Sequence, residues 1–186
     1  MSSIKIVFTL ISKQFALAAR EIRSLPKAPA STSGKDGQEE SLRLYQEVFT
    51  LLAGGEGLPF FRPNYLEISG RVFSLNMELA EIKRQISALS ADALKSVRDC
   101  LGNTDKAFSL LGLAWSRFLE DPDKAGRDAA AALALIISLR QSIADIFFRS
   151  RPAGEMAVLG LRWDNLSQRL FEIDLALRKL IAVARI

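Results

Sequence analysis

Histidine is absent from this 186-residue sequence, and Cys100 is its only cysteine. Without histidine, the chain cannot build a Ser-His-Asp or Cys-His nucleophile system or a metal site with histidine ligands. A single cysteine forms neither an intrachain disulfide nor a cysteine-rich zinc site. Its acidic neighbour Asp99 should raise the thiol pKa rather than activate the thiol. The sequence therefore predicts no catalytic, cofactor-binding or metal-binding residues, and we expect a protein that is not an enzyme.

Carboxylates are the remaining candidates for acid–base chemistry or a cation site. They form two pairs and one acidic turn: Glu78 with Glu81, Glu172 with Asp174, and the group Glu120, Asp121, Asp123 and Asp128. Basic residues flank both pairs, which is typical of a solvated helix face. Asp121 precedes Pro122, the order expected at a helix N-terminus. The acidic spacing does not match a calcium-binding loop, so we interpret these residues as structural.

Long uninterrupted apolar stretches are also missing. The longest covers 129–137, which is nine residues, whereas a membrane-spanning helix needs about 20. Arg140, Gln141 and Asp145 interrupt the segment that follows. We therefore expect no membrane-spanning helix.

Acidic residues are scarce near the N-terminus. Residues 1–35 carry six basic groups and one acid, Glu21, so the net charge of +4 resides in this arm and the other 151 residues are nearly neutral. A broad basic face for nucleic acid is therefore not expected. The composition fits a cytoplasmic protein, free or peripheral to a membrane, and leaves organellar targeting of the basic, amphipathic N-terminus open.

Apolar side chains recur every three or four residues through most of the chain, which is the spacing of one helix face. The clearest stripe is Met156, Leu159, Trp163, Leu166, Leu170, Ile173, Leu177, Leu180 and Ala184. Patterns typical of strands are nearly absent, and short connections favour antiparallel neighbours. The predicted fold class is all-α: a long antiparallel up-down-up-down four-helix bundle over 64–186, with an additional N-terminal amphipathic helix and one short helix.

The domain organisation follows from the helix breakers. Residues 1–25 should form a basic amphipathic helix that Pro26 terminates. Residues 26–38 are rich in Pro, Ala, Ser and Gly and read as a flexible linker. The bundle domain is predicted over 39–186. It starts with a short helix at 39–54, for which Gly54 is a terminator.

Smaller features refine the helix boundaries. Asn64 and Glu67 have the spacing of a capping box that would open the first long helix. Ser90 is a candidate N-cap. Gly102 followed by Asn103 should kink or break the helix around it.

The N-terminal helix is the strongest candidate for function, because it combines a wide apolar stripe with positive charge. Such a helix can dock on a partner or lie on an anionic membrane. Phe8, Ile11 and Phe15 are the candidate contacts on it, together with the aromatic pair Phe60 and Phe61 in a loop between prolines. The sequence leaves open whether the helix packs on its own bundle, a second copy, a partner or a membrane.

Three functions are compatible with these patterns. Long, coiled-coil-like apolar stripes favour a non-enzymatic adaptor or assembly subunit that binds a protein partner or itself. The first alternative is a peripheral membrane or lipid-binding protein that uses the N-terminal helix. The further alternative is a ligand-binding bundle or enzyme with a pocket between helices.

Overall fold

The computed structural model describes residues 3–25, 33–54, 62–149 and 154–184. Every regular element in these ranges is helical, which confirms the predicted all-α class. The elements are α1 (Ser3–Ser24), α2 (Ser33–Ala53), α3 (Arg62–Ile86), α4 (Ala91–Ser96), α5 (Arg98–Arg117), α6 (Pro122–Ile143), the π-helical segment η1 (Ala144–Arg149) and α7 (Glu155–Ala184).

Several helix ends lie where the sequence places them. Asp121 caps α6 by accepting a hydrogen bond from the Lys124 amide at 2.9 Å. Ser90 caps α4 through a hydrogen bond from the Ala93 amide. Polar side chains at these positions satisfy amides that have no partner inside the helix.

Other boundaries differ from the prediction. α2 begins at Ser33, so part of the predicted linker is helical and the short helix is a full 21 residues long. α3 begins at Arg62, which puts Asn64 inside the helix rather than at its cap. α5 continues through Gly102, and the break lies at Val97, between α4 and α5. Val97 is fully buried there, so packing rather than local propensity sets this break.

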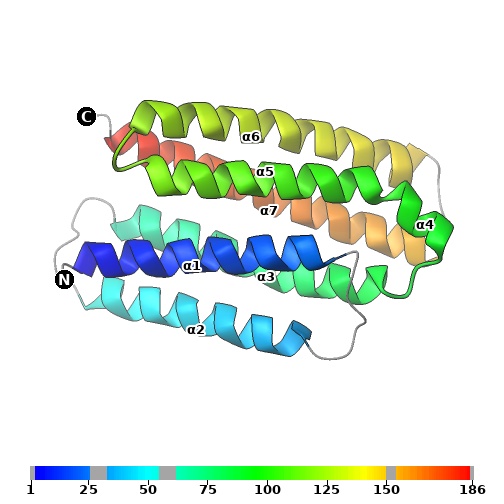
Figure 1. Ribbon diagram of the computed structural model, residues 1–186, viewed down its shortest axis with the longest axis horizontal. Helices are drawn as coiled ribbons and strands as arrows, with labels where there is room; N and C mark the ends of the chain where they lie inside the picture. The colour runs from blue at the N-terminus through cyan, green and yellow to red at the C-terminus, as the bar shows by residue number, and fades with distance from the viewer. Residues whose placement is uncertain (1–2, 26–32, 55–61, 150–153, 185–186) are drawn as a thin grey trace.

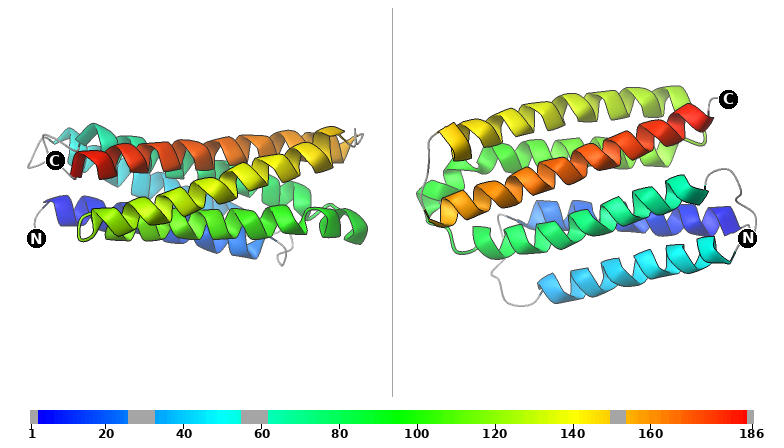
Figure 2. Two further views of the ribbon diagram at one scale, coloured as in Figure 1. Left: turned by 90° about the horizontal axis from the view of Figure 1, so that it is seen from above. Right: turned by 180° about the vertical axis from the view of Figure 1, so that it is seen from behind.

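The helices form two layers that run along the length of the molecule (Figure 1). α1 and α5 lie in one layer, and α3 and α7 lie behind them (Figure 2). In the centre, α1 contacts α3, α3 contacts α7, α7 contacts α5, and α5 contacts α1. α2 packs beside α1 and α3 at one edge, and α6 packs beside α5 and α7 at the other.

Cross-helix contacts give the helix directions. Glu67 pairs with Lys179 and Arg71 with Glu172, so α3 and α7 are antiparallel. Lys83 pairs with Glu21, while Ser69 bonds Gln14, so α1 and α3 are parallel. Successive long helices alternate in direction, as the short connections require. The central group differs from the predicted set of four C-terminal helices, because α1 occupies a central position and α6 lies at an edge.

The α1–α2–α3 interface carries a repeating layer of buried polar residues. Ser69, Asn76 and Lys83 follow one another at intervals of seven along α3, and all are at most 5% exposed. They bond Gln14, Ser41 and Glu21 respectively. Polar groups at heptad spacing fix helix register, because any shift would leave them buried without partners.

α7 and η1 approach each other closely at Gly160. A Cβ atom added to Gly160 would lie 2.6 Å from the Cβ of Phe147. Phe147 is 3% exposed. A glycine is therefore required where α7 crosses η1. Phe147 reaches this crossing from within η1, the π-helical segment that continues α6.

One helical stretch, Pro122–Arg149, is long and apolar enough by composition to cross a membrane. Within the fold, 28% of the most apolar part of this stretch is buried. The sequence predicted no such helix, because its uninterrupted apolar runs are too short. A helix can be apolar on average although isolated polar side chains interrupt it. A mostly buried core helix of a soluble protein can have the same length and composition.

Candidate interaction groove

An aromatic ladder joins α1 to α5. The Phe8 ring stacks on Trp115 with centroids 4.8 Å apart, and Phe15 lies 6.0 Å from Trp115 and 5.3 Å from Phe108. Phe118 joins the same group, 5.1 Å from Trp115. Such ring pairs add roughly 0.5–1.5 kcal/mol each beyond the area that they bury. The ladder thus joins α1 to α5 through aromatic contacts in the core.

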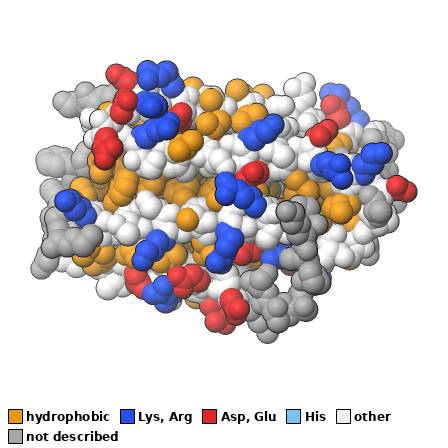
Figure 3. All heavy atoms as spheres, viewed as in Figure 1, with side chains coloured by type: hydrophobic (Ala, Val, Ile, Leu, Met, Phe, Trp, Pro, Cys, Tyr) orange, Lys and Arg blue, Asp and Glu red, His pale blue; other side chains and the backbone are white. Residues whose placement is uncertain are grey.

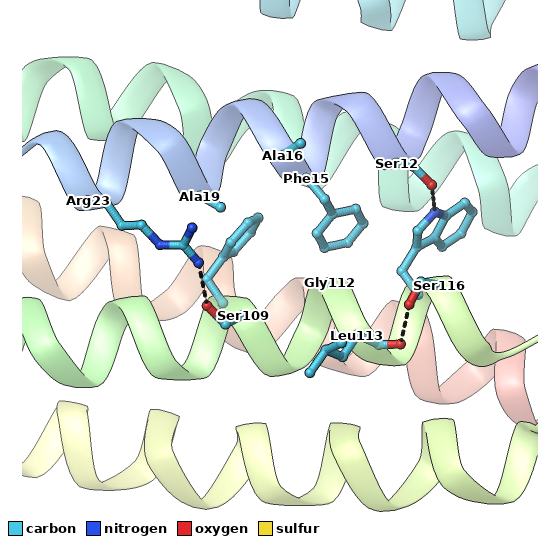
Figure 4. Close-up of a pocket in the computed structure, with 11 residues that line it drawn as sticks. Ser12, Phe15, Ala16, Ala19, Arg23, Ser109, Gly112, Leu113 and Ser116 are labelled. Carbon is cyan, nitrogen blue, oxygen red and sulfur yellow. Dashed lines mark hydrogen bonds between the residues drawn. The ribbon is translucent and has the colours of Figure 1, made fainter.

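A shallow groove of about 420 Å³ lies over this ladder. Its floor is formed by three buried aromatic residues, Phe15, Phe108 and Trp115. Figure 4 shows the groove between the two helices, with Phe15 labelled. Its walls are mostly small side chains from both helices: Ser12, Ala16 and Ala19 on α1, and Ser109, Gly112 and Ser116 on α5. Figure 3 shows hydrophobic side chains along the middle of this face, between α5 and α1.

Polar contacts mark the two ends of the groove. At one end, Ser12 Oγ accepts a hydrogen bond from the Trp115 indole nitrogen at 2.9 Å. At the other, Arg23 pairs with Asp105 at 3.2 Å and donates to Ser109 Oγ at 3.4 Å. The Arg23 side chain is 62% exposed, so it keeps a positive charge at the surface. The groove is therefore apolar in the middle and has an exposed ion pair, Arg23 with Asp105, at one end.

The candidate contacts on the N-terminal helix belong to the core instead. Ile11 is fully buried and Phe15 is 4% exposed, while Phe8 is half-buried against Trp115. Packing within the chain therefore accounts for most of their apolar surface, and of the three only Phe15 also lines the groove. Phe60 and Phe61 lie outside the described residues.

The carboxylate pairs are held by arginines. Arg162 bridges Glu78 and Glu81 at 3.6 and 3.5 Å. Hydrogen bonding from Arg84 lowers the pKa of Glu81. Glu172 pairs with Arg71 at 2.9 Å. These groups form ion pairs at helix contacts, in agreement with their structural interpretation.

Burial perturbs the pKa values of several titratable groups, among them Tyr65, Cys100 and Asp174. Burial, with a smaller contribution from Asp99, raises the pKa of the Cys100 thiol to about 12. The thiol is therefore not activated, which agrees with the prediction made from its acidic neighbour Asp99. Burial also raises the pKa of Asp174 above its ordinary value, although Arg178 acts in the opposite direction. None of these three residues lines the groove.

Among the described residues, no three Cys, Asp or Glu side chains gather closely enough to hold a metal ion. In the acidic turn, Asp121 acts as a helix cap and Asp128 pairs with Arg117. No family model matches the sequence, and no curated protein or solved structure matches it.

Sequence reasoning missed the groove itself. Its walls come from residues about a hundred positions apart, and small side chains leave no periodic signal. Gly112 gives the one usable clue. Glycine is a poor helix former, and alanine at this position would make the helix more stable by about 0.5–1 kcal/mol.

Proposed function

We propose that this protein is a non-enzymatic interaction module that binds a helix of a protein partner in the α1–α5 groove. The observation that carries the proposal is the groove itself, with an aromatic floor and walls of small side chains. A helix laid along the groove can approach closely over Ala16 and Gly112 and bury its own apolar face there. Arg23 and Asp105, whose side chains are 62% and 38% exposed, then offer a charged pair to polar residues at one end of the partner helix.

Gly112 supports this reading. A Cβ atom at this position would lie 3.8 Å from Phe15, which is an ordinary contact. The fold therefore has room for alanine, and the missing methyl group instead keeps the groove open. Gly112→Ala separates stability from binding, since it should stabilise the fold by about 0.5–1 kcal/mol and weaken the partner complex.

The test compares three immobilised full-length proteins: wild type, Leu113→Glu and Leu42→Glu. Leu113 lies on the groove wall and is 41% exposed, and Leu42 on α2 is 43% exposed and distant from the groove. A protein retained from native extract by wild type and by Leu42→Glu, but lost with Leu113→Glu, is then purified and titrated by calorimetry. We expect Leu113→Glu to weaken the purified complex at least tenfold.

Two results contradict the proposal. One is a partner that binds Leu113→Glu as tightly as wild type, which places its contact on another surface. The other is the absence of any protein that distinguishes the two variants. Equal circular dichroism spectra and melting temperatures of the variants show that the comparison reports binding rather than unfolding.

A further inference from the structure

The outer face of α6 is apolar and exposed within this chain. α6 lies at the edge of the bundle and packs against α5 and α7 (Figure 1). Ala130, Ala134 and Ser138 are exposed along its outer side, and Ile137 is 57% exposed. Only 28% of the most apolar window in Pro122–Arg149 is buried. A helix this apolar and this little covered marks an interaction surface.

The charges at the two ends of this face have a defined order. Asp123 is followed one turn later by Arg127, and Asp145 is followed by Arg149, with which it forms an ion pair. Asp123 and Arg149 each lie 13 residues from Ile136, and Arg127 and Asp145 each lie nine residues from it. Going towards Ile136 from the N-terminal end, the acidic residue therefore comes first. Going towards it from the C-terminal end, the basic residue comes first.

This order fits a second copy of the same helix in antiparallel orientation. With the twofold axis at the level of Ile136, whose own side chain is buried in the core, that pairing places Asp123 opposite the second copy's Arg149, and Arg127 opposite its Asp145. One register satisfies both pairs. A parallel arrangement in register would oppose each charge to itself and would be repelled.

The middle of the face suits close packing. In the same register Ala134 lies opposite Ser138 of the second copy. Small side chains at the crossing allow the helix axes to come within about 8 Å, the short end of the usual range. We propose that the protein forms a twofold-symmetric dimer through the outer faces of two antiparallel α6 helices. Such an interface is self-complementary, as twofold symmetry requires.

Two half-swapped variants test the register directly. The first is Asp123→Arg with Arg127→Asp, and the second is Asp145→Arg with Arg149→Asp. Each keeps an oppositely charged pair within its own helix. Alone, each would place like charges opposite each other in the dimer, and we expect its dissociation constant to rise at least tenfold by sedimentation equilibrium. Mixed, the two variants are complementary, and native mass spectrometry should detect the heterodimer in preference to either homodimer.

A central variant provides the second arm. Ala134→Glu places a charge at the crossing and should leave a folded monomer, whereas Ala53→Glu, at an exposed position on α2, should leave the dimer unchanged. The proposal is overturned if wild type is monomeric at high concentration, or if the half-swapped variants dimerise alone as well as they do mixed. It is also overturned if wild type instead binds phosphatidylcholine–phosphatidylglycerol vesicles and Ala134→Glu abolishes that binding, since α6 would then face lipid. This surface is separate from the α1–α5 groove, so either proposal can fail alone.

Discussion

Lys83 Nζ lies 3.3 Å from Glu21 Oε2, and both residues are at least 92% buried within the α1–α2–α3 part of the fold. Lys83 also donates to Ser24 Oγ at 3.3 Å. An ion pair in this position links α1 to α3 at the end of the layer that includes Ser69 and Asn76. Its main contribution is to the choice of register, since two apolar residues could supply equal stability.

Removing one partner of this pair should be far worse than removing both. Lys83→Met leaves the Glu21 carboxylate buried and should lower the free energy of unfolding by about 3–5 kcal/mol. Lys83→Met combined with Glu21→Met should recover most of that loss. Urea denaturation of the two single variants and the double variant measures the coupling. Additive losses would show that the two side chains do not act as a pair.

Gly160 and Gly102 should respond oppositely to alanine. Gly160→Ala forces a Cβ atom against Phe147, 2.6 Å away, and should destabilise the protein by about 1–3 kcal/mol. A Cβ atom added to Gly102, at an exposed position of α5, would have no neighbour within 4 Å. Gly102→Ala should therefore stabilise the protein by about 0.5–1 kcal/mol. Thermal melts of both variants check the prediction. A stable Gly160→Ala protein would mean that α7 and η1 are not in such close contact.

The Cys100 thiol should be inert in the folded protein. Its pKa of about 12 makes the thiolate population at pH 8 on the order of a thousandfold smaller than for an unperturbed thiol. Labelling with a chromogenic disulfide should therefore be slow in native buffer and fast in denaturant. Stoichiometric labelling within the mixing time in native buffer would contradict the buried position of this side chain.

Asp174 should make the fold less stable as the pH rises. Because burial raises its pKa above the ordinary value of 3.8, the stability that it contributes is fully present below that value. This stability is lost as the pH rises through the folded-state pKa. Asp174→Asn carries no charge and should melt at a higher temperature than wild type at pH 7. The difference should shrink towards zero below about pH 4. A difference that does not vary with pH would assign the effect to packing instead.

Deletion of α1 should unfold the protein rather than release an appendage. Val7, Ile11 and Phe15 are at most 4% exposed and contribute to the shared core. Loss of the helix would expose Phe108 and Trp115 across the α1–α5 contact. We expect a chain that starts at residue 26 to lose its cooperative thermal transition by circular dichroism. A cooperative transition in that chain would show that α1 is dispensable to the core.

The local features of the fold could be predicted because they depend on neighbouring residues. The stripe of Leu159, Trp163, Leu166 and Leu170 is fully buried, since a 3.6-residue period determines which face of a helix becomes apolar. Asp121 before Pro122 has only one favourable role, at a helix N-terminus. The early start of α2 was missed because residues 33–38 have low helix propensity and few apolar side chains, and their helical state depends on α1 and α3.

The sequence by itself determined an all-helical chain, the faces of its long helices and the absence of histidine chemistry. Helical periodicity and composition are local properties, so they need no knowledge of neighbours. Only the tertiary structure decided that α1 packs in cis, with Phe8 against Trp115, and that Ser69, Asn76 and Lys83 form one polar layer. It also decided that Ala16 and Gly112 line one groove while Ala134 faces outward. An amphipathic helix has an apolar face that must be buried. Which element of the structure buries it depends on contacts between residues far apart in the chain.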